Sequence, residues 1–209
     1  KRLSLKWSSA GGRSVDELTE VNQPIFRGLG GYRVFVIRNG EQARFKDVYT
    51  LSDLKKFTVG QGAFWGDTRV LEHAGINVEK STQARKLWKM LNAKRFDYVA
   101  LAVHEPWKEI ALRPDLDMAV EPNILLVYPS ALYFYVHKDD VQLANLISLG
   151  MQKALKDGSY YKMLISSDMI QDTIKYANLS QRRVIEIDNP FIKDSNMIRT
   201  ELLQQLQHK

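Results

Sequence analysis

The segment from Gly60 to Thr68 is the part of the sequence best suited to binding chemistry. It reads GQGAFWGDT and joins a short predicted strand, Thr58–Val59, to a predicted helix. Unpaired amide N–H groups and the dipole at a helix N-terminus favour a carboxylate or a phosphate. The segment therefore predicts a turn that holds an anion, with Gly60, Gly62 and Thr68 facing the ligand. The alternative is an ordinary tight turn before a helix.

Two residues limit what this turn can bind. Trp65 stands where a dinucleotide-binding fingerprint has its third glycine, and no P-loop lysine follows, so the motif predicts no nucleotide site. Asp67 lies where the helix begins, and its carboxylate would compete with an anionic ligand. It can instead meet the ammonium group of a ligand, or it can simply cap the helix.

Aromatic side chains can supply the apolar wall of a ligand cleft. The candidates are Trp65, Tyr98, Trp107 and Tyr128. Trp88 belongs to the apolar stripe of its predicted helix, and we interpret it as packing.

No group of residues predicts catalysis or a metal. The four histidines, His73, His104, His137 and His208, show no HExxH or HxH spacing, and no serine lies in a GxSxG motif. The chain has no cysteine, which excludes thiol catalysis and cysteine-zinc sites. We expect a protein that is not an enzyme and uses no cofactor and no metal, and we interpret His104 as structural.

Composition and charge are those of a globular protein. The 209 residues are 44% hydrophobic and 26% charged, which excludes a disordered chain, and no apolar run reaches the roughly 20 residues that cross a bilayer. The net charge of +6 comes from scattered lysines and arginines without a basic block. No nucleic-acid-binding motif accompanies them, so we expect no nucleic-acid partner.

Predicted strands alternate with predicted helices. Tyr32–Arg38 and Tyr98–Val103 are apolar runs typical of buried strands, Leu125–Val136 reads as two short strands separated by Pro129, and Arg183–Ile187 is a late strand. Caps and apolar spacing predict the helices, which are Leu51–Phe57, Asp67–Ala74, a helix after Ser81, a long helix after Asp140 that ends at Gly158, and the segments 160–165, 168–177 and 196–207. This succession predicts an α/β fold with mostly parallel sheets.

Two strands bracket a stretch long enough for a sheet of its own, which predicts two lobes. Residues 1–33 and 133–209 are assigned to the first lobe, and residues 34–132 to the second. The strands at Tyr32–Arg38 and Leu132–Val136 would be the crossings between the lobes, which is typical of a cleft with a hinge.

Several motifs, in order, resemble a known family. LSDL at 51–54 followed by TVGQG at 58–62, KRFDY at 94–98, and the long segment 133–164 that ends in DGSYYKML are similar to the corresponding elements of bacterial extracellular solute-binding proteins of the amino-acid-binding kind. The resemblance covers residues 7–165 and implies the type II periplasmic-binding fold, in a divergent branch. The family has a βαβ unit of the first lobe before the point at which this chain starts.

The resemblance also implies site residues. Arg13 falls where the family carries an arginine that clamps a ligand carboxylate, a role suited to its bidentate guanidinium; the alternative is an exposed arginine. Glu105 falls where the family places an acid that pairs with the ligand's amino group, while Pro106 after it also predicts a helix start capped by Glu105. Asp67 is the other acid available for the amine.

These residues predict a monomeric protein that binds an amino acid or related carboxylate for uptake through an ABC-type membrane permease. The resemblance implies a periplasmic location, with a signal peptide removed or outside the numbered chain. A sensor or interaction domain of the same fold is the alternative, and an enzyme of the same α/β class is a third. The third would need an acid-base pair or nucleophile that the sequence does not display.

Overall fold

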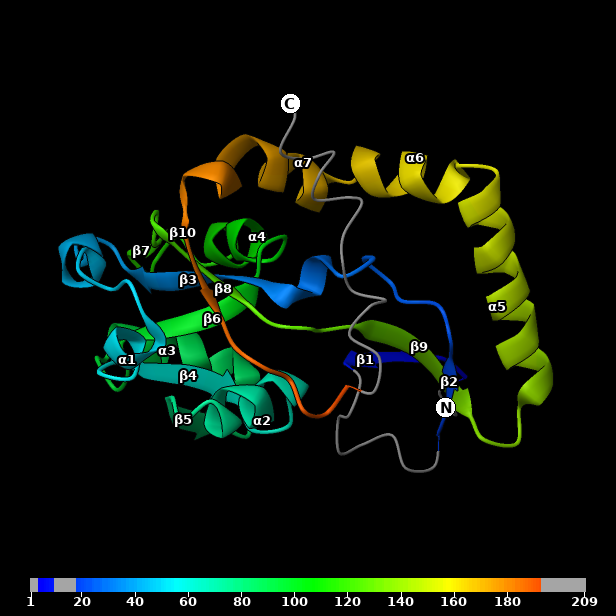
Figure 1. Cartoon of the computed structure of the whole chain (residues 1–209), viewed down its shortest axis with the longest axis horizontal. Helices are drawn as coiled ribbons and strands as arrows, with labels where there is room; N and C mark the ends of the chain where they lie inside the picture. The colour runs from blue at the N-terminus through cyan, green and yellow to red at the C-terminus, as the bar shows by residue number, and fades with distance from the viewer. Residues whose placement is uncertain (1–3, 10–17, 193–209) are drawn as a thin grey trace.

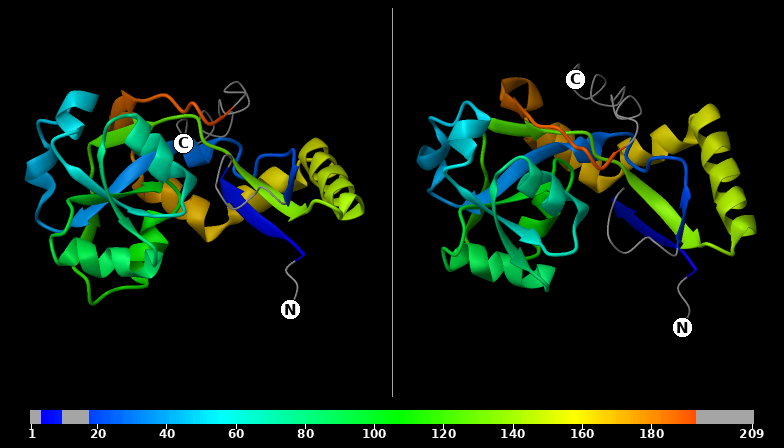
Figure 2. Two further views of the ribbon diagram at one scale, coloured as in Figure 1. Left: turned by 90° about the horizontal axis from the view of Figure 1, so that it is seen from below. Right: turned by 60° about the horizontal axis from the view of Figure 1, so that its bottom comes forward.

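The strands of the protein form two separate sheets. The computed structural model describes residues 4–9 and 18–192, and these contain a seven-stranded sheet and a three-stranded sheet (Figure 1). In the views of Figure 2 the two sheets stand apart, with connecting segments between them.

The large sheet has the strand order β10-β8-β3-β6-β4-β5, with β7 also paired to β3. Its strands are β3 (Tyr32–Arg38), β4 (Thr58–Gly62), β5 (Asn77–Ser81), β6 (Tyr98–Ala102), β7 (Met118–Val120), β8 (Ile124–Val127) and β10 (Arg183–Glu186). β3 runs antiparallel to β6, β7 and β8, whereas β4 is parallel to β5 and β6, and β8 is parallel to β10. The predicted α/β fold with a mainly parallel sheet is confirmed here.

The small sheet is antiparallel throughout. Its central strand β9 (Leu132–His137) lies between β1 (Lys6–Ser9) and β2 (Leu18–Val21). The expectation of mostly parallel sheets therefore holds for the large sheet and not for the described part of the small one. β1 and β2 were not predicted, because each has four residues of mixed polarity and no alternation long enough to read as a strand.

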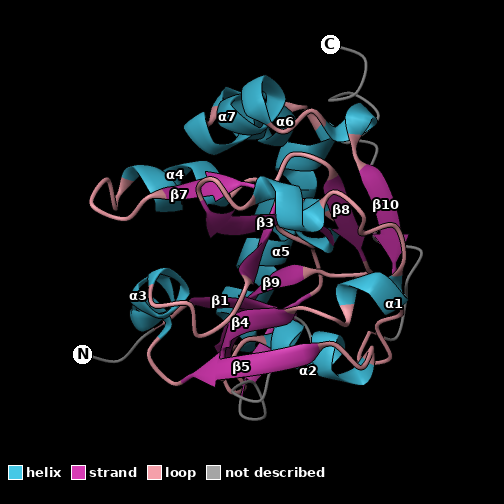
Figure 3. Ribbon diagram, turned by 90° about the vertical axis from the view of Figure 1, so that its left-hand side faces the viewer, coloured by secondary structure: helices cyan, strands magenta, loops and turns pink. Residues whose placement is uncertain are grey.

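Helices cover both faces of the large sheet, as expected for strands whose residues are apolar on both sides. α1 (Leu51–Leu54) and α2 (Gly66–His73) cover one face, where their side chains join a core built around Phe35 and Tyr98. α3 (Leu87–Asn92) and α4 (Pro106–Ala111) cover the other (Figure 3).

Three helices connect the two sheets. α5 (Val141–Lys156) packs against the small sheet, where Ala144 meets Val21 and Val136. α6 (Ser159–Ser166) and α7 (Asp168–Tyr176) continue from it and cover part of the large sheet (Figure 1). The prediction that Asp140 caps the start of α5 is confirmed, since Leu143 N–H donates to the Asp140 carboxylate at 3.1 Å. In residues 4–9 and 18–192, no helix is both long and apolar enough to span a bilayer.

Local predictions around β4 need correction. The strand predicted at Thr58–Val59 continues to Gly62, because residues 60–62 pair with 79–81 of β5. The two glycines also leave room for aromatic rings against the strand: a Cβ at Gly60 would lie 2.2 Å from the Phe96 ring, and one at Gly62 2.6 Å from Trp65. Ser81 ends a strand that was not predicted, and its hydroxyl accepts from Gln83 N–H.

The helix predicted after Ser81 begins later than expected. A 3-10 turn comes first, and α3 then starts at Leu87. The predicted helix 196–207 lies outside the described residues. Strands β6, β8, β9 and β10 and helices α5 to α7 lie close to their predicted positions.

Besides helices α5 to α7, two short segments cross between the sheets. The strands predicted as crossings do not cross, because β3 lies within the large sheet and β9 within the small one. Residues 22–31 lead from β2 to β3, and residues 128–131 lead from β8 to β9. Tyr128 N–H donates to Gly31 O at 3.0 Å, and Ile25 N–H donates to Leu132 O at 2.7 Å. The residue bounds of the two lobes stay a prediction, and β10 pairs with β8 of the large sheet although 133–209 was assigned to the first lobe.

Candidate functional site

Arg33 is the central charged residue of the candidate site. It lies on β3, only 4% of its surface is exposed, and its Nη2 donates to Asp67 Oδ1 at 2.6 Å and to Ser130 Oγ at 3.2 Å. A buried charge is costly unless it is paired and hydrogen-bonded. Burial tends to lower the pKa of Arg33, but the neighbouring groups, the Asp67 carboxylate above all, raise it more, so the guanidinium stays protonated.

Asp67 is the partner of Arg33 and not the cap of its helix. It is the second residue of α2, whose N-cap position is held by Trp65 without a side-chain hydrogen bond. Asp67 Oδ1 accepts from Arg33 and also from the Tyr128 hydroxyl, at 3.0 Å. The predicted capping role is therefore wrong, because the side chain turns toward the sheet and pairs with a buried cation.

Sheet topology explains why these residues meet. α2 follows the carboxyl end of β4, Tyr128 follows the carboxyl end of β8, and Glu105 follows β6, all on parallel strands. β3 runs the opposite way, so its second residue, Arg33, reaches the same edge. In Figure 1 the arrow of β4 points toward the small sheet, so this edge faces it.

His104 and Glu105 extend the site at the end of β6. The His104 ring is buried, stacks on Phe26 of a crossing segment with ring centroids 4.3 Å apart, and has its pKa lowered to about 3 by burial and by the nearby Arg33 charge. His104 is therefore uncharged at neutral pH.

Glu105 keeps part of its surface exposed, and its Oε2 accepts from Ala102 N–H at 2.8 Å. Burial of the carboxyl raises its pKa, while the charge of Arg33 opposes the shift. Glu105 holds the N-cap position of α4, but its side chain makes no capping hydrogen bond because it bonds back to the strand. Glu105 thus lies at the predicted cap position, but its side chain does not cap the helix.

The other predicted residues have structural contacts. The Thr68 hydroxyl donates to Gly62 O at 2.7 Å, and Gly60 and Gly62 make room for aromatic rings. Tyr98 is buried beside Phe35, with ring centroids 4.3 Å apart, and starts β6 at the opposite end from Glu105. The structure therefore places Tyr98 in the core and not at this edge.

Arg13 lies outside the described residues. Its role in holding a ligand carboxylate stays a prediction.

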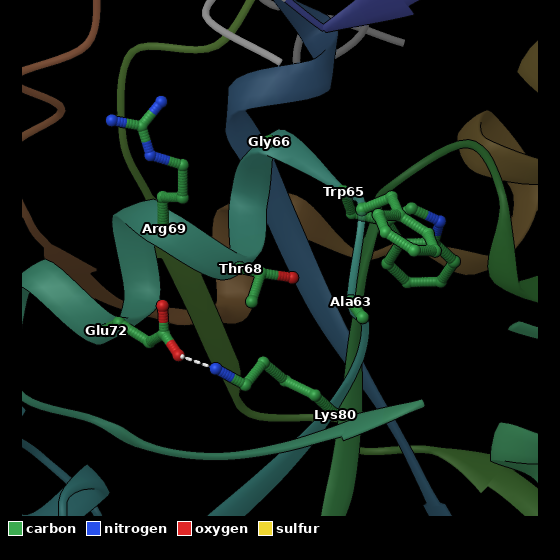
Figure 4. Close-up of a pocket in the computed structure, with 8 residues that line it drawn as sticks. Ala63, Trp65, Gly66, Thr68, Arg69, Glu72 and Lys80 are labelled. Atoms are coloured by element: carbon green, nitrogen blue, oxygen red, sulfur yellow. Dashed lines mark hydrogen bonds and ion pairs between the residues drawn. The ribbon is translucent and has the colours of Figure 1, made fainter. Parts of the chain in front are cut away.

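A small pocket lies beside the predicted turn (Figure 4). It is lined by Ala63, Phe64, Trp65, Gly66, Thr68, Arg69, Glu72 and Lys80. An ion pair of 2.7 Å between Glu72 and Lys80 spans one side of it, and Phe64 is 72% exposed. Trp65 and Thr68, both predicted to face a ligand, are among its lining residues, and their role in binding stays a prediction.

Arg33 and Ser130 were missed by the sequence interpretation. The signal for Arg33 was available, because a charged residue inside the apolar run YRVFVIR must find a partner when the strand is buried. Ser130 carried no signal beyond its place after Pro129. Across the part of the chain that the structure describes, no cluster of histidine or acidic side chains could hold a metal ion.

Comparisons with known proteins identify relatives by structure alone. No protein-family model matches the sequence, and no curated protein matches it. Holo ArgBP from T. maritima is 22% identical, with a TM-score of 0.52 over 79% of this chain and 69% of that one. AbpA, an amino acid ABC transporter substrate-binding protein from Streptococcus pneumoniae solved with L-arginine, is 15% identical, with a TM-score of 0.53 over 80% and 67%.

A third similar structure is the GluR0 ligand-binding core in complex with L-glutamate. It is 14% identical, with a TM-score of 0.54 over 79% of this chain and 66% of that one. The chain thus spans about two thirds of the length of the structures that it matches. At these identities the likeness establishes the fold, and the predicted two-lobed periplasmic-binding fold is confirmed.

Proposed function

We propose that this protein, which shares its fold with solute-binding proteins solved with amino acids, binds an amino acid or a related small carboxylate between its two sheets. The observation that carries the proposal is the buried polar network of Arg33, Asp67 and Tyr128 at the carboxyl edge of the large sheet. In open α/β sheets ligands bind outside the carboxyl ends of the strands. Buried ion pairs contribute little net stability, which supports a binding role for this one.

The ligand contacts follow from the predicted site. Arg13 holds the ligand carboxylate, Glu105 meets the ammonium group, and Trp65 contributes apolar surface. Tyr128, predicted as a further wall residue, is only 1% exposed and instead holds Asp67 through its hydroxyl. Glu105 is suited to this task because its pKa is raised by burial, so an arriving ammonium group would restore the charged form that burial disfavours.

The proposed role is binding without turnover. The protein would act in the periplasm as a monomer and deliver its ligand to an ABC-type permease. Its similarity to AbpA, an amino acid ABC transporter substrate-binding protein, supports this role. The hydrogen-bonded crossing segments at 22–31 and 128–131 would act as the hinge.

Calorimetric titration tests the proposal. The purified protein is titrated with the common amino acids, small peptides and organic acids, and at least one amino acid should bind and raise the melting temperature. No binding by any member of the panel would contradict the proposal.

A variant tests the predicted clamp. Arg13→Ala should weaken binding by about one to two orders of magnitude, because a charged hydrogen bond is worth about 1.5 to 3 kcal/mol. Its control is Arg85→Ala, an exposed arginine of the 3-10 turn before α3, where affinity should stay the same. If Arg85→Ala weakened binding and Arg13→Ala did not, the ligand would have to bind elsewhere.

A further inference from the structure

We infer that Asp67 determines the class of ligand: its carboxylate already pairs with the buried guanidinium of Arg33, so the ligand presents a cation there and not an anion. The inference rests on the proposed function and deepens it, since it assigns the ligand a positively charged side chain. The candidates are basic amino acids that carry an ammonium or guanidinium group.

Arg33 already has a carboxylate partner, Asp67. A guanidinium attracts carboxylates, and Arg33 on β3 supplies one at this edge of the sheet. Asp67, on the first turn of α2, places its Oδ1 2.6 Å from Arg33 Nη2. A ligand carboxylate would have to displace a carboxylate that the fold itself supplies.

Arg33 and Asp67 are joined by a single hydrogen bond. Arg33 uses Nη2 for Asp67, while its buried Nε has no hydrogen-bond partner among the described residues. The pair is therefore not the two-bond fork that arginine and carboxylate can form. The hydrogen bonds that Asp67 accepts from Arg33 and from Tyr128 both go to Oδ1.

The second carboxylate oxygen of Asp67 is available to a ligand. In the part of the chain that the structure describes, Oδ2 of Asp67 accepts no hydrogen bond, and the side chain keeps 16% of its surface exposed. Oδ2 can therefore accept from a ligand donor without breaking the pair with Arg33.

The charges around Asp67 favour a positively charged ligand group. Asp67 balances the one positive charge of Arg33, His104 is uncharged, and Glu105 adds a second carboxyl nearby. A further anion would meet two carboxyls and no free cation among these residues. A cation would meet oxygen acceptors at both, with the ligand's α-ammonium at Glu105 and its side-chain cation at Asp67.

L-Arginine and L-citrulline test this inference, because they have nearly the same shape and differ in side-chain charge. Isothermal titration of the wild type should show arginine binding roughly ten- to a hundred-fold more tightly than citrulline, the range expected for one charged hydrogen bond. Asp67→Asn should remove most of that preference. Asparagine keeps an oxygen for Arg33 and Tyr128 but loses the charge.

Asp47→Asn is the matched control. The Asp47 side chain is 80% exposed and follows the end of β3 opposite to Arg33, so this variant should keep the wild-type preference for arginine. Near-ultraviolet circular dichroism checks that Asp67→Asn is folded. A second test needs no variant: the wild type should bind neutral L-glutamine more tightly than anionic L-glutamate.

Equal affinities for arginine and citrulline in the wild type would overturn the inference. So would a preference for arginine that survives in Asp67→Asn, or a preference for glutamate over glutamine. In each case the binding of amino acids itself, and so the proposed function, would stand. If the wild type bound none of the four amino acids, the proposed function would fail and the inference with it.

Discussion

Arg33 shows how one residue can be both necessary to the fold and central to the site. Its guanidinium is buried at the edge of the large sheet and is compensated by Asp67 and Ser130. Removing one member of a buried pair leaves the other charge without compensation, whereas replacing both with apolar groups removes the penalty.

Arg33→Met should therefore destabilise the protein by about 3 kcal/mol, the lower end of the range for broken buried pairs because Asp67 keeps some contact with water. The double variant Arg33→Met with Asp67→Leu should lose less. Urea denaturation measures both. Arg85→Met, at an exposed arginine, should stay within about 0.5 kcal/mol of the wild type. A double variant less stable than the single one would contradict this account.

His104 predicts how stability depends on pH. Its pKa is lowered to about 3 in the folded state, mainly by burial, from the ordinary value of 6.5. The folded state thus disfavours the protonated ring, so the stability associated with His104 is present above pH 6.5 and is lost as pH falls toward 3. Near pH 4.5, two units below the ordinary pKa, the loss should be about 3 kcal/mol.

The comparison with His104→Gln isolates this effect, because all other groups titrate alike in both proteins. The stability of the wild type relative to the variant should fall between pH 7 and pH 4.5 in urea unfolding. Parallel curves for the two proteins over this range would show that His104 does not carry the effect.

At the scale of elements, the contact between the two crossing segments depends on a glycine. Gly31 donates to Gly28 O, and a Cβ at Gly31 would lie 2.4 Å from Tyr128 O in the other segment. A backbone oxygen cannot move aside as a flexible side chain can. The close approach of these segments therefore requires a residue without a side chain.

Gly31→Ala should destabilise the protein by about 1 to 3 kcal/mol, the usual cost of forcing an extra methyl group into a packed site. Gly150→Ala is the matched control, because nothing lies within 4 Å of the added Cβ and the residue is inside α5. It should stabilise by roughly 0.5 to 1 kcal/mol, since glycine is unfavourable in a helix. Thermal unfolding distinguishes the two, and equal effects would contradict the role given to Gly31.

At the scale of the whole molecule, the first crossing between the sheets has an unusual backbone. Three consecutive residues in the first crossing, Phe26, Arg27 and Gly28, have positive φ angles of 73°, 49° and 87°. Such backbone is unfavourable for residues with side chains and is found where surrounding contacts hold it in place. Tyr160 of α6 supplies contacts, because its hydroxyl lies within hydrogen-bond distance of Phe26 N–H and Ile25 O.

Binding should close the sheets over the ligand. The radius of gyration measured by small-angle X-ray scattering should decrease when an amino acid that binds is added, and the protein should gain about 2.7 kcal/mol of stability at a hundred-fold excess over Kd. Arg13→Ala at the same ligand concentration should show smaller changes in both. Stabilisation without a change in radius would favour binding to a rigid site.

The sequence by itself determined the α/β class, the strands at 32–38 and 98–102, and the helices α5 to α7, because apolar periodicity, caps and glycine stops are local signals. It also placed Asp67 and Tyr128 among the candidates. Only the tertiary structure showed that Arg33 joins them, since Arg33 is separated from Asp67 by 34 positions and Tyr128 from Asp67 by 61. The reversed direction of β3 brings Arg33 to the edge where the parallel strands end, and strand direction is fixed by packing between distant segments rather than by any local pattern.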